Sequence, residues 1–225
     1  MRVLRWPHPV YVRGGTSTDS AVLYELLVTG EYDLVADLGS PKFIIDGGAN
    51  IGATSVYFLQ LYPSVRIIAV EPFAETLEVC EKNLAPYAGR AQVVHGAIWS
   101  HTGTVVLHRE DEEWANKVRE PLSGETGTAA AKAFSMAELI ALRGESVDLL
   151  KLDIEGGEKE VFRPGTTDWL ACIRNLVIEL HDQECADRFW AAMAPYEYEL
   201  SSKDKVYFCR NLRPRTQEAV PLQDR

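Results

Sequence analysis

The chain has 225 residues, of which 46% are hydrophobic and 25% are charged, and this balance suits one folded globular domain with a sizeable core. Its formal net charge of -10 argues against nucleic acid as a partner, because binding to phosphates needs clustered Lys and Arg. No apolar run is long enough to span a membrane, and we expect a cytoplasmic protein with no membrane partner.

Residues 1–39 are predicted to be an N-terminal helical leader. Its start is broken by Pro7, Pro9 and Arg13, which excludes a signal-peptide core. A helix is expected from Asp19 to about Thr29. Asp19 is either the N-cap of that helix or a contact for cofactor or acceptor.

Residues 40–213 are predicted to be the main domain, in which short β-branched runs alternate with helical stretches. This pattern indicates βαβ units and a largely parallel sheet. Strands are expected at residues 42–48, 65–72, 91–99, 146–157 and 173–181, with helices at 51–62 and 74–86 between the first three. Most of these strands have unbroken apolar cores, as strands buried on both faces should.

The second half of the domain adds shorter predicted elements. Residues 102–110 are expected to follow the third strand through a Thr-Gly turn as an antiparallel strand, and 111–132 to be a long surface loop. Ser135 and Glu138 form a capping box for a short helix. A further helix from 184, ending near Pro195, and a hairpin at 199–211 close the domain, leaving 214–225 as a polar tail.

The stretch IIDGGANIG, residues 44–52, is the first motif that indicates ligand binding. Its glycines, Gly47, Gly48 and Gly52, follow a strand, where they let the backbone approach a ligand at the carboxyl edge of a parallel sheet. The match to GxGxxG is partial because Ala49 stands at the third position.

The charge of this motif distinguishes between cofactors. A pyrophosphate is repelled by a carboxylate such as Asp46, whereas a sulfonium or ammonium group is attracted, and S-adenosylmethionine carries both. Asn50 adds a polar group to the loop. The next strand ends in Glu71 and Pro72, where a carboxylate can accept hydrogen bonds from ribose hydroxyls, a role that NAD proteins share.

Taken in order, IIDGGANIG, AVEP, HGAIW followed by TGTVVL, VDLLKLDIEGGE and LVIELH resemble the FkbM family of S-adenosylmethionine-dependent methyltransferases. KLDIEGGE, residues 151–158, is the most family-specific part. The leader RGGTSTDSAVLYELLVTGEYD is also similar to that of some members, so the resemblance covers roughly residues 13–211.

This resemblance implies an α/β fold of the class I methyltransferase, Rossmann-like type. Its seven-stranded mixed sheet has an antiparallel last strand and is flanked by helices in three αβα layers. It also implies positions for the cofactor. The methionine part is expected near Asp46, Gly48 and Asn50, the ribose at Glu71, and the adenine along Ala97 and Ile98. The third strand lacks an acidic residue for the adenine amino group, and backbone groups around Gly96 and Ala97 are expected to replace it.

Two further strand ends are expected to supply the groups that act on the acceptor. Asp153 and Glu155 are two apart and should point to the same side, and Glu179 and His181 repeat the arrangement on the next strand. His181 is the expected base for an alcohol acceptor, with Asp153 or Glu155 orienting the acceptor or accepting the proton. Lys151 is expected to pair with Asp153.

No metal site is predicted. The four cysteines, at 80, 172, 185 and 209, are scattered and form no zinc pattern. A magnesium or manganese site at Asp153, Glu179 and His181 is a minor alternative. The residue types suit these ions, but no ligand spacing supports the site.

The sequence therefore predicts a methyltransferase that uses S-adenosylmethionine to methylate a hydroxyl of a small molecule, such as a sugar or a polyketide- or peptide-type secondary metabolite. In the long loop, Trp114, Asn116 and Lys117 either close over the cleft or belong to an exposed variable loop. The alternatives are an NAD-dependent oxidoreductase, which Asp46 and Ala49 disfavour, and a noncatalytic cofactor-binding protein of the same fold. A homo-oligomer is compatible with the sequence.

Overall fold

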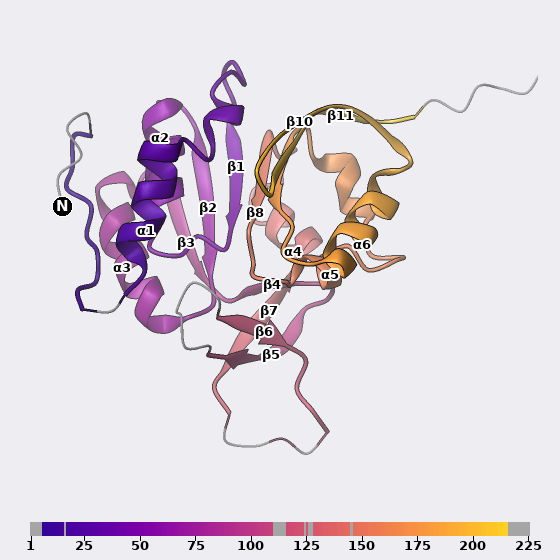
Figure 1. Ribbon diagram of the computed structural model, residues 1–225, viewed down its shortest axis with the longest axis horizontal. Helices are drawn as coiled ribbons and strands as arrows, with labels where there is room; N and C mark the ends of the chain where they lie inside the picture. The colour runs from indigo at the N-terminus through magenta and orange to yellow at the C-terminus, as the bar shows by residue number, and fades with distance from the viewer. Residues whose placement is uncertain are drawn as a thin grey trace, which may run out of the picture.

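The computed structural model describes residues 6–15, 17–109, 116–123, 125, 128–144 and 146–215. These residues form a large sheet between two groups of helices, together with a smaller second sheet (Figure 1). The strands of the large sheet are β1 (Phe43–Gly47), β2 (Arg66–Glu71), β3 (Ala91–His95), β8 (Leu149–Leu152), β9 (Leu176–Glu179), β10 (Tyr196–Lys203) and β11 (Val206–Pro214).

The helices comprise α1 (Asp19–Tyr24), α2 (Ala53–Leu61), α3 (Ala74–Leu84), α4 (Met136–Ala141), α5 (Glu158–Val161) and α6 (Gln183–Met193). Shorter π or 3-10 turns are η1 (Glu25–Thr29), η2 (Asp33–Val35), η3 (Ala85–Tyr87) and η5 (Asp168–Cys172).

The seven described strands of the large sheet lie in the order β10-β11-β9-β8-β1-β2-β3. All neighbours from β9 to β3 are parallel, and β11 is antiparallel to both β9 and β10. Helices α1, α2 and α3 lie on one side of this sheet and α4, α5 and α6 on the other (Figure 1). The predicted three-layer α/β fold is confirmed.

Two apolar cores lie on the two faces of the sheet because side chains alternate along each strand. On β1, Phe43 and Ile45 belong to the core that contains α5 and α6 residues such as Phe189, while Ile44 belongs to the core that contains α2 residues such as Phe58. This double burial explains the unbroken apolar runs of the central strands.

The leader packs on the second of these cores. Leu23, Leu26 and Tyr32 are at most 3% exposed and lie in the same cluster as Phe58. The expected helix does run from Asp19 to Thr29, although its last turn is a π turn closed by Gly30, whose φ is +66°. Burial of these side chains holds the leader against the sheet and beside its carboxyl edge.

The predicted strand at 91–99 is wrong in one respect, because it is two strands in different sheets. β3 ends at His95, and β4 (Ala97–Trp99) pairs with β7 (Ala130–Ser135) in the second sheet. Gly96 permits this change, since a Cβ there would lie 2.6 Å from the carbonyl oxygen of Lys132. The chain thus leaves the large sheet at the carboxyl end of β3.

The second sheet also corrects the predictions for residues 102–132. β5 (Gly103–His108) is antiparallel as expected, but it pairs with β7 and with β6 (Lys117–Arg119), not with the third strand. The described part of the expected surface loop therefore contains β6 and the start of β7. Residues 110–115 lie outside the described residues, and so does Trp114.

Two helix starts follow their capping residues. The Ser135 hydroxyl accepts a hydrogen bond from the Glu138 N–H at 3.2 Å, and the Asp182 carboxylate accepts one from the Cys185 N–H at 2.7 Å.

The four cysteines are free thiols. Among the described helices, none has both the length and the apolar character needed to cross a membrane.

Candidate active site

A cavity of about 580 Å³ opens at the carboxyl edge of the parallel strands. This volume falls within the range of small-molecule sites, roughly 300–1,000 Å³. Eleven of the residues predicted from sequence line it: Gly48, Asn50, Glu71, Pro72, Gly96, Ala97, Ile98, Asp153, Glu155, Glu179 and His181. Four do not line it: Asp19, Asp46, Gly47 and Gly52.

Gly48 allows the first loop to lie against the loop after β8. Its φ is +71°, and a Cβ on it would lie 1.8 Å from the carbonyl oxygen of Asp153. Only glycine fits such a close approach. This contact aligns the two loops that border the cavity.

Glu71 is a buried carboxylate held in place by the backbone. It is 5% exposed, and its two oxygens accept hydrogen bonds from the N–H groups of Asn50 at 3.0 Å and Phe73 at 2.9 Å. Burial raises the pKa of Glu71 to about 7, and those two backbone N–H groups oppose the rise. Each oxygen keeps a lone pair for a ligand hydroxyl.

Asp46 has a different environment from the one its sequence position suggests. It is 0% exposed, accepts a hydrogen bond from the Ser55 hydroxyl at 2.6 Å, and lies 3.2 Å from the Lys151 ammonium. Its charge is therefore balanced inside the protein. The negative charge that faces the cavity comes from other carboxylates.

Lys151 connects the first loop to the loop after β8. Its ammonium donates hydrogen bonds to the carbonyl oxygens of Gly47 at 3.2 Å and Gly48 at 2.8 Å, and it lies 3.5 Å from the Asp153 carboxylate. Burial alone lowers the pKa of Lys151, but Asp46 and Asp153 raise it above its ordinary value. The expected pair with Asp153 forms, and Asp46 is an additional partner.

His181 lies among several carboxylates. Its Nε2 is 3.2 Å from Glu155, 3.5 Å from Asp153 and 4.0 Å from Glu179, and its Nδ1 is 3.2 Å from Glu158. Although burial lowers the pKa of His181, the adjacent carboxylates of Glu155 and Glu158 raise it to about 11. The ring is therefore an imidazolium at neutral pH.

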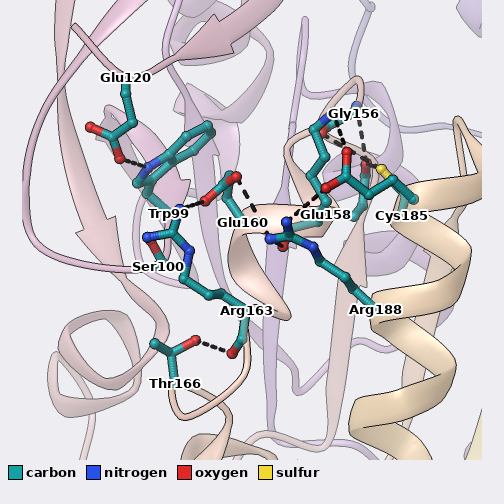
Figure 2. Close-up of polar contacts among 12 residues, drawn as sticks. Trp99, Ser100, Glu120, Gly156, Glu158, Glu160, Arg163, Thr166, Cys185 and Arg188 are labelled. Carbon is teal, nitrogen blue, oxygen red and sulfur yellow. Dashed lines mark hydrogen bonds and ion pairs between the residues drawn. The ribbon is translucent and has the colours of Figure 1, made fainter.

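Glu158, which was not predicted as a site residue, supports this arrangement from the start of α5. Figure 2 shows its carboxylate close to Gly156 and Cys185. It is 0% exposed and accepts hydrogen bonds from the N–H groups of Ile154 at 2.9 Å and Gly156 at 3.0 Å. It ends the KLDIEGGE motif, but nothing in the sequence indicated its contact with His181.

Asp153 and Glu155 meet His181 through a turn and not through strand alternation. β8 ends at Leu152, and Glu155 and Gly156 have φ values of 55° and 90°. The expectation that both carboxylates lie on one strand face is therefore wrong. The left-handed turn brings Glu155 back toward His181.

Two half-buried glutamates carry shifted pKa values in this cavity. Burial, followed by repulsion from Asp153, raises the pKa of Glu179 to about 7, and the same two causes raise that of Glu31 to about 7. Glu31 comes from the leader and was not predicted as a site residue. Both groups exchange protons near neutral pH.

Asp19 holds the leader in place and is not the N-cap, which is Thr18. It is 0% exposed and pairs with Arg13, whose guanidinium lies 2.6 Å away and whose backbone N–H donates at 2.7 Å. Arg13 lines the cavity and also donates to Thr76 at 3.2 Å. Asp19 thus contributes to the cavity wall through Arg13.

Ligand atoms of Asp153, Glu179 and His181 lie within 4.8 Å of one another, so this set has the composition of a metal site. The same His181 nitrogen that would bind a cation contacts Glu155.

Asn116 of the loop before β6 also lines the cavity, whereas Lys117 does not.

Comparison with known proteins matches residues 46–206 to the methyltransferase FkbM domain. Methyltransferase sdnD of Sordaria araneosa is 27% identical over 193 residues, which cover 72% of this chain and 74% of that protein. The 2-O-methyltransferase NoeI of Sinorhizobium fredii is 26% identical over 157 residues, covering 63% and 64%.

A crystal structure of methyltransferase FkbM from Methylobacillus flagellatus has the same fold, with a TM-score of 0.53 and 18% identity. The match covers 75% of this chain but only 43% of that one. Because the methyltransferase FkbM domain matches residues 46–206, more than half of the chain, this chain belongs to the FkbM methyltransferase family.

Proposed function

We propose that this methyltransferase uses S-adenosylmethionine to methylate a hydroxyl group of a small molecule such as a sugar or a secondary metabolite. The observation that carries the proposal is one cavity that combines the backbone-held Glu71 with the group formed by Asp153, Glu179 and His181. Family membership supports the cofactor, and the similarity to a 2-O-methyltransferase supports an oxygen acceptor.

The cavity residues fit this cofactor. Glu71 would accept hydrogen bonds from the ribose hydroxyls, because its oxygens already face the cavity from the end of β2. Gly48 would leave room for the methionine part, and Ala97 and Ile98 would cover the adenine. When bound, S-adenosylmethionine supplies a methyl group on a sulfonium that is already a good leaving group.

We assign the base to Glu179 in place of His181. A histidine with a pKa of about 11 holds its proton at neutral pH, whereas a carboxylate with a pKa of about 7 accepts one readily. Glu179 would take the proton of the acceptor hydroxyl, and the His181 imidazolium would hold Glu155 and Asp153 in place. Asp46 acts indirectly, by positioning Lys151.

Calorimetric titration tests the cofactor. We expect S-adenosylhomocysteine to bind at micromolar concentration. Glu71→Gln should lower this affinity by roughly 10- to 100-fold, because it removes hydrogen bonds to a charged group. Glu78→Gln, on the exposed face of α3, is the matched control and should bind normally. Heat from NADH with none from S-adenosylhomocysteine would sink the proposal in favour of an oxidoreductase.

Turnover distinguishes an enzyme from a noncatalytic binding protein. With an acceptor drawn from a panel of sugars and polyketide- or peptide-type alcohols, Glu179→Gln should lose methyl transfer while keeping its affinity for S-adenosylhomocysteine. Full activity in Glu179→Gln together with loss in His181→Gln would return the base to His181.

A further inference from the structure

The cavity continues past the proposed cofactor contacts to an end formed by the leader and the β10–β11 turn. Glu31 and Tyr32 line it from the leader, and Lys203 lines it from the hairpin. The Lys203 ammonium donates hydrogen bonds to the carbonyl oxygens of Thr29 and, at 3.0 Å, Gly30. These bonds place the leader residues beside the ends of β8 and β9.

Tyr32 brings a hydroxyl without a partner to this end of the cavity. The residue is 3% exposed, and its ring packs edge-on against Phe58 with centroids 6.1 Å apart. The hydroxyl forms no hydrogen bond with the residues that the structure describes, and it is not among their fully buried unpartnered atoms, so its oxygen is open to the cavity. Buried polar groups are normally hydrogen-bonded, so a hydroxyl in a cavity wall is available to a ligand.

Glu31 adds an unpaired negative charge next to this hydroxyl. Its carboxylate has no ion pair or hydrogen bond with any residue in the described ranges; burial and repulsion from Asp153 and Glu179 raise its pKa, and the Lys151 ammonium opposes that rise. Most of the cations that line the cavity are engaged: Lys151 pairs with Asp46 and Asp153, His181 with Glu155 and Glu158, and Lys203 binds two carbonyl oxygens. Lys205 forms no hydrogen bond or ion pair with the described residues. The lining carboxylates still outnumber the cations, with Glu25, Glu31, Glu71, Asp153, Glu155, Glu179 and Asp204 against Arg13, Lys151, His181, Lys203 and Lys205.

We propose that Glu31 and Tyr32 form a recognition site for a positively charged amino group on the methyl acceptor. This inference rests on the proposed function, because it locates the amino group in the acceptor end of the same cavity. An ammonium group donates three hydrogen bonds, which suits the Glu31 carboxylate and the Tyr32 hydroxyl. The hydroxyl to be methylated would then lie toward Glu179.

An organic cation fits these residues better than a metal ion. Glu31 and Tyr32 are not in the set of Asp153, Glu179 and His181 that has metal-ligand composition. The Tyr32 pKa is raised well above its ordinary value by burial and by Asp153 and Glu31, so its hydroxyl is neutral and a poor metal ligand. A neutral hydroxyl readily bonds an ammonium N–H.

Fragment binding to the enzyme loaded with S-adenosylhomocysteine tests the proposal without a known acceptor. The probes are small alcohols in matched sets that carry a primary amine, its N-acetyl form or a carboxylic acid, observed by saturation-transfer NMR. We expect amines to bind about tenfold more tightly than their acetamides, because only the amine forms a charge-assisted contact with the Glu31 carboxylate. Glu31→Gln should remove most of this advantage, and Tyr32→Phe should reduce it.

Glu78→Gln removes one exposed carboxylate that does not line the cavity and should keep the amine advantage. Equal binding of amines and acetamides, or an advantage that survives Glu31→Gln, would overturn the proposal. So would Mg²⁺ binding that is lost in Glu179→Gln in the absence of any amine preference. Failure of S-adenosylhomocysteine to bind would instead count against the proposed function, which separates the two outcomes.

Discussion

Lys151 is the residue that balances charge at the carboxyl edge of the sheet. It is 2% exposed and lies on the central strand β8, between the buried Asp46 and the cavity residue Asp153. A buried ion pair adds little stability relative to apolar packing, but loss of one partner leaves an uncompensated charge. Replacing one member of the pair should therefore cost more stability than replacing both.

We expect Lys151→Met to lower the free energy of unfolding by about 3–5 kcal/mol, the usual cost of breaking a buried pair. Urea unfolding measures it. The double variant Asp46→Leu with Lys151→Met should recover much of the loss, because neither charge is then stranded. Lys159→Met, which removes a lysine from a surface pair, should change stability by less than about 1 kcal/mol.

The proposed base makes activity dependent on pH. Glu179 accepts a proton only when ionised, so kcat/KM should fall as pH decreases through about 7. His181, with its pKa at about 11, stays protonated across this range. A pH–rate profile of the wild type measures this, and a kcat/KM that stays level between pH 8 and pH 6 would contradict the assignment.

At the scale of elements, local sequence patterns identified strands buried on both faces more successfully than strands with mixed surfaces. β1 and β2 read as apolar runs because helices cover both sides. β7, with the sequence AAKAFS, carries alanines and a lysine and gave no strand signal, although Ala131 and Ala133 are buried in the second sheet. Its pairing with β4 and β5 is a tertiary effect that local propensity does not contain.

The glycine of the first loop provides a test at this scale. Gly48→Ala should lower the melting temperature and abolish S-adenosylhomocysteine binding, because the new Cβ would overlap the Asp153 carbonyl and the backbone has positive φ. Gly89→Ala is the matched control, since no atom lies within 4 Å of the site of its Cβ. Normal binding in Gly48→Ala would show that the two loops need not be in contact.

The hairpin turn should control the mobility of the leader. Lys203→Met removes the hydrogen bonds to Thr29 and Gly30, so amide hydrogen exchange in residues 25–33 should become faster. Lys205→Met, in the same turn, serves as the control because its ammonium forms no hydrogen bond or ion pair with a described residue. Equal protection in both variants would mean that the buried Leu26 and Tyr32 alone hold the leader.

For the whole molecule, the buried carboxyl groups make stability depend on pH. Glu71 and Glu179 have pKa values near 7 in the folded protein against 4.5 for the ordinary group, so the folded state binds more protons between these values. The free energy of unfolding contributed by these groups should therefore fall as pH rises from 4.5 to 7. His181 acts over a higher window: its stabilisation is complete below pH 6.5 and is lost as pH rises through about 11.

Urea unfolding of the wild type and Glu71→Gln across this range checks the first effect. The variant should show a shallower fall between pH 4.5 and pH 7, and parallel curves would contradict the raised pKa of Glu71.

Much of the cavity was predictable because parallel strands end at one edge, so the residues after β1, β2, β8 and β9 had to converge. The charges of individual residues were not predictable. Asp46 lies near the end of the apolar strand β1, and Asp153 directly follows the apolar strand β8. Lys151 neutralises Asp46 inside the protein, whereas Asp153 lines the cavity. Glu31 and Tyr32 belong to the leader, and their positions depend on how the leader packs against residues far along the chain.

The region that matches the family begins at residue 46, after Glu31 and Tyr32. If those residues select the acceptor as proposed, the catalytic edge and the selecting segment can change independently in evolution. A leader that kept its core residues Leu23 and Leu26 but changed Glu31 and Tyr32 would then redirect the enzyme to another acceptor without disturbing β1 or β2. Exchange of leaders between relatives would be an economical route to new methylation products.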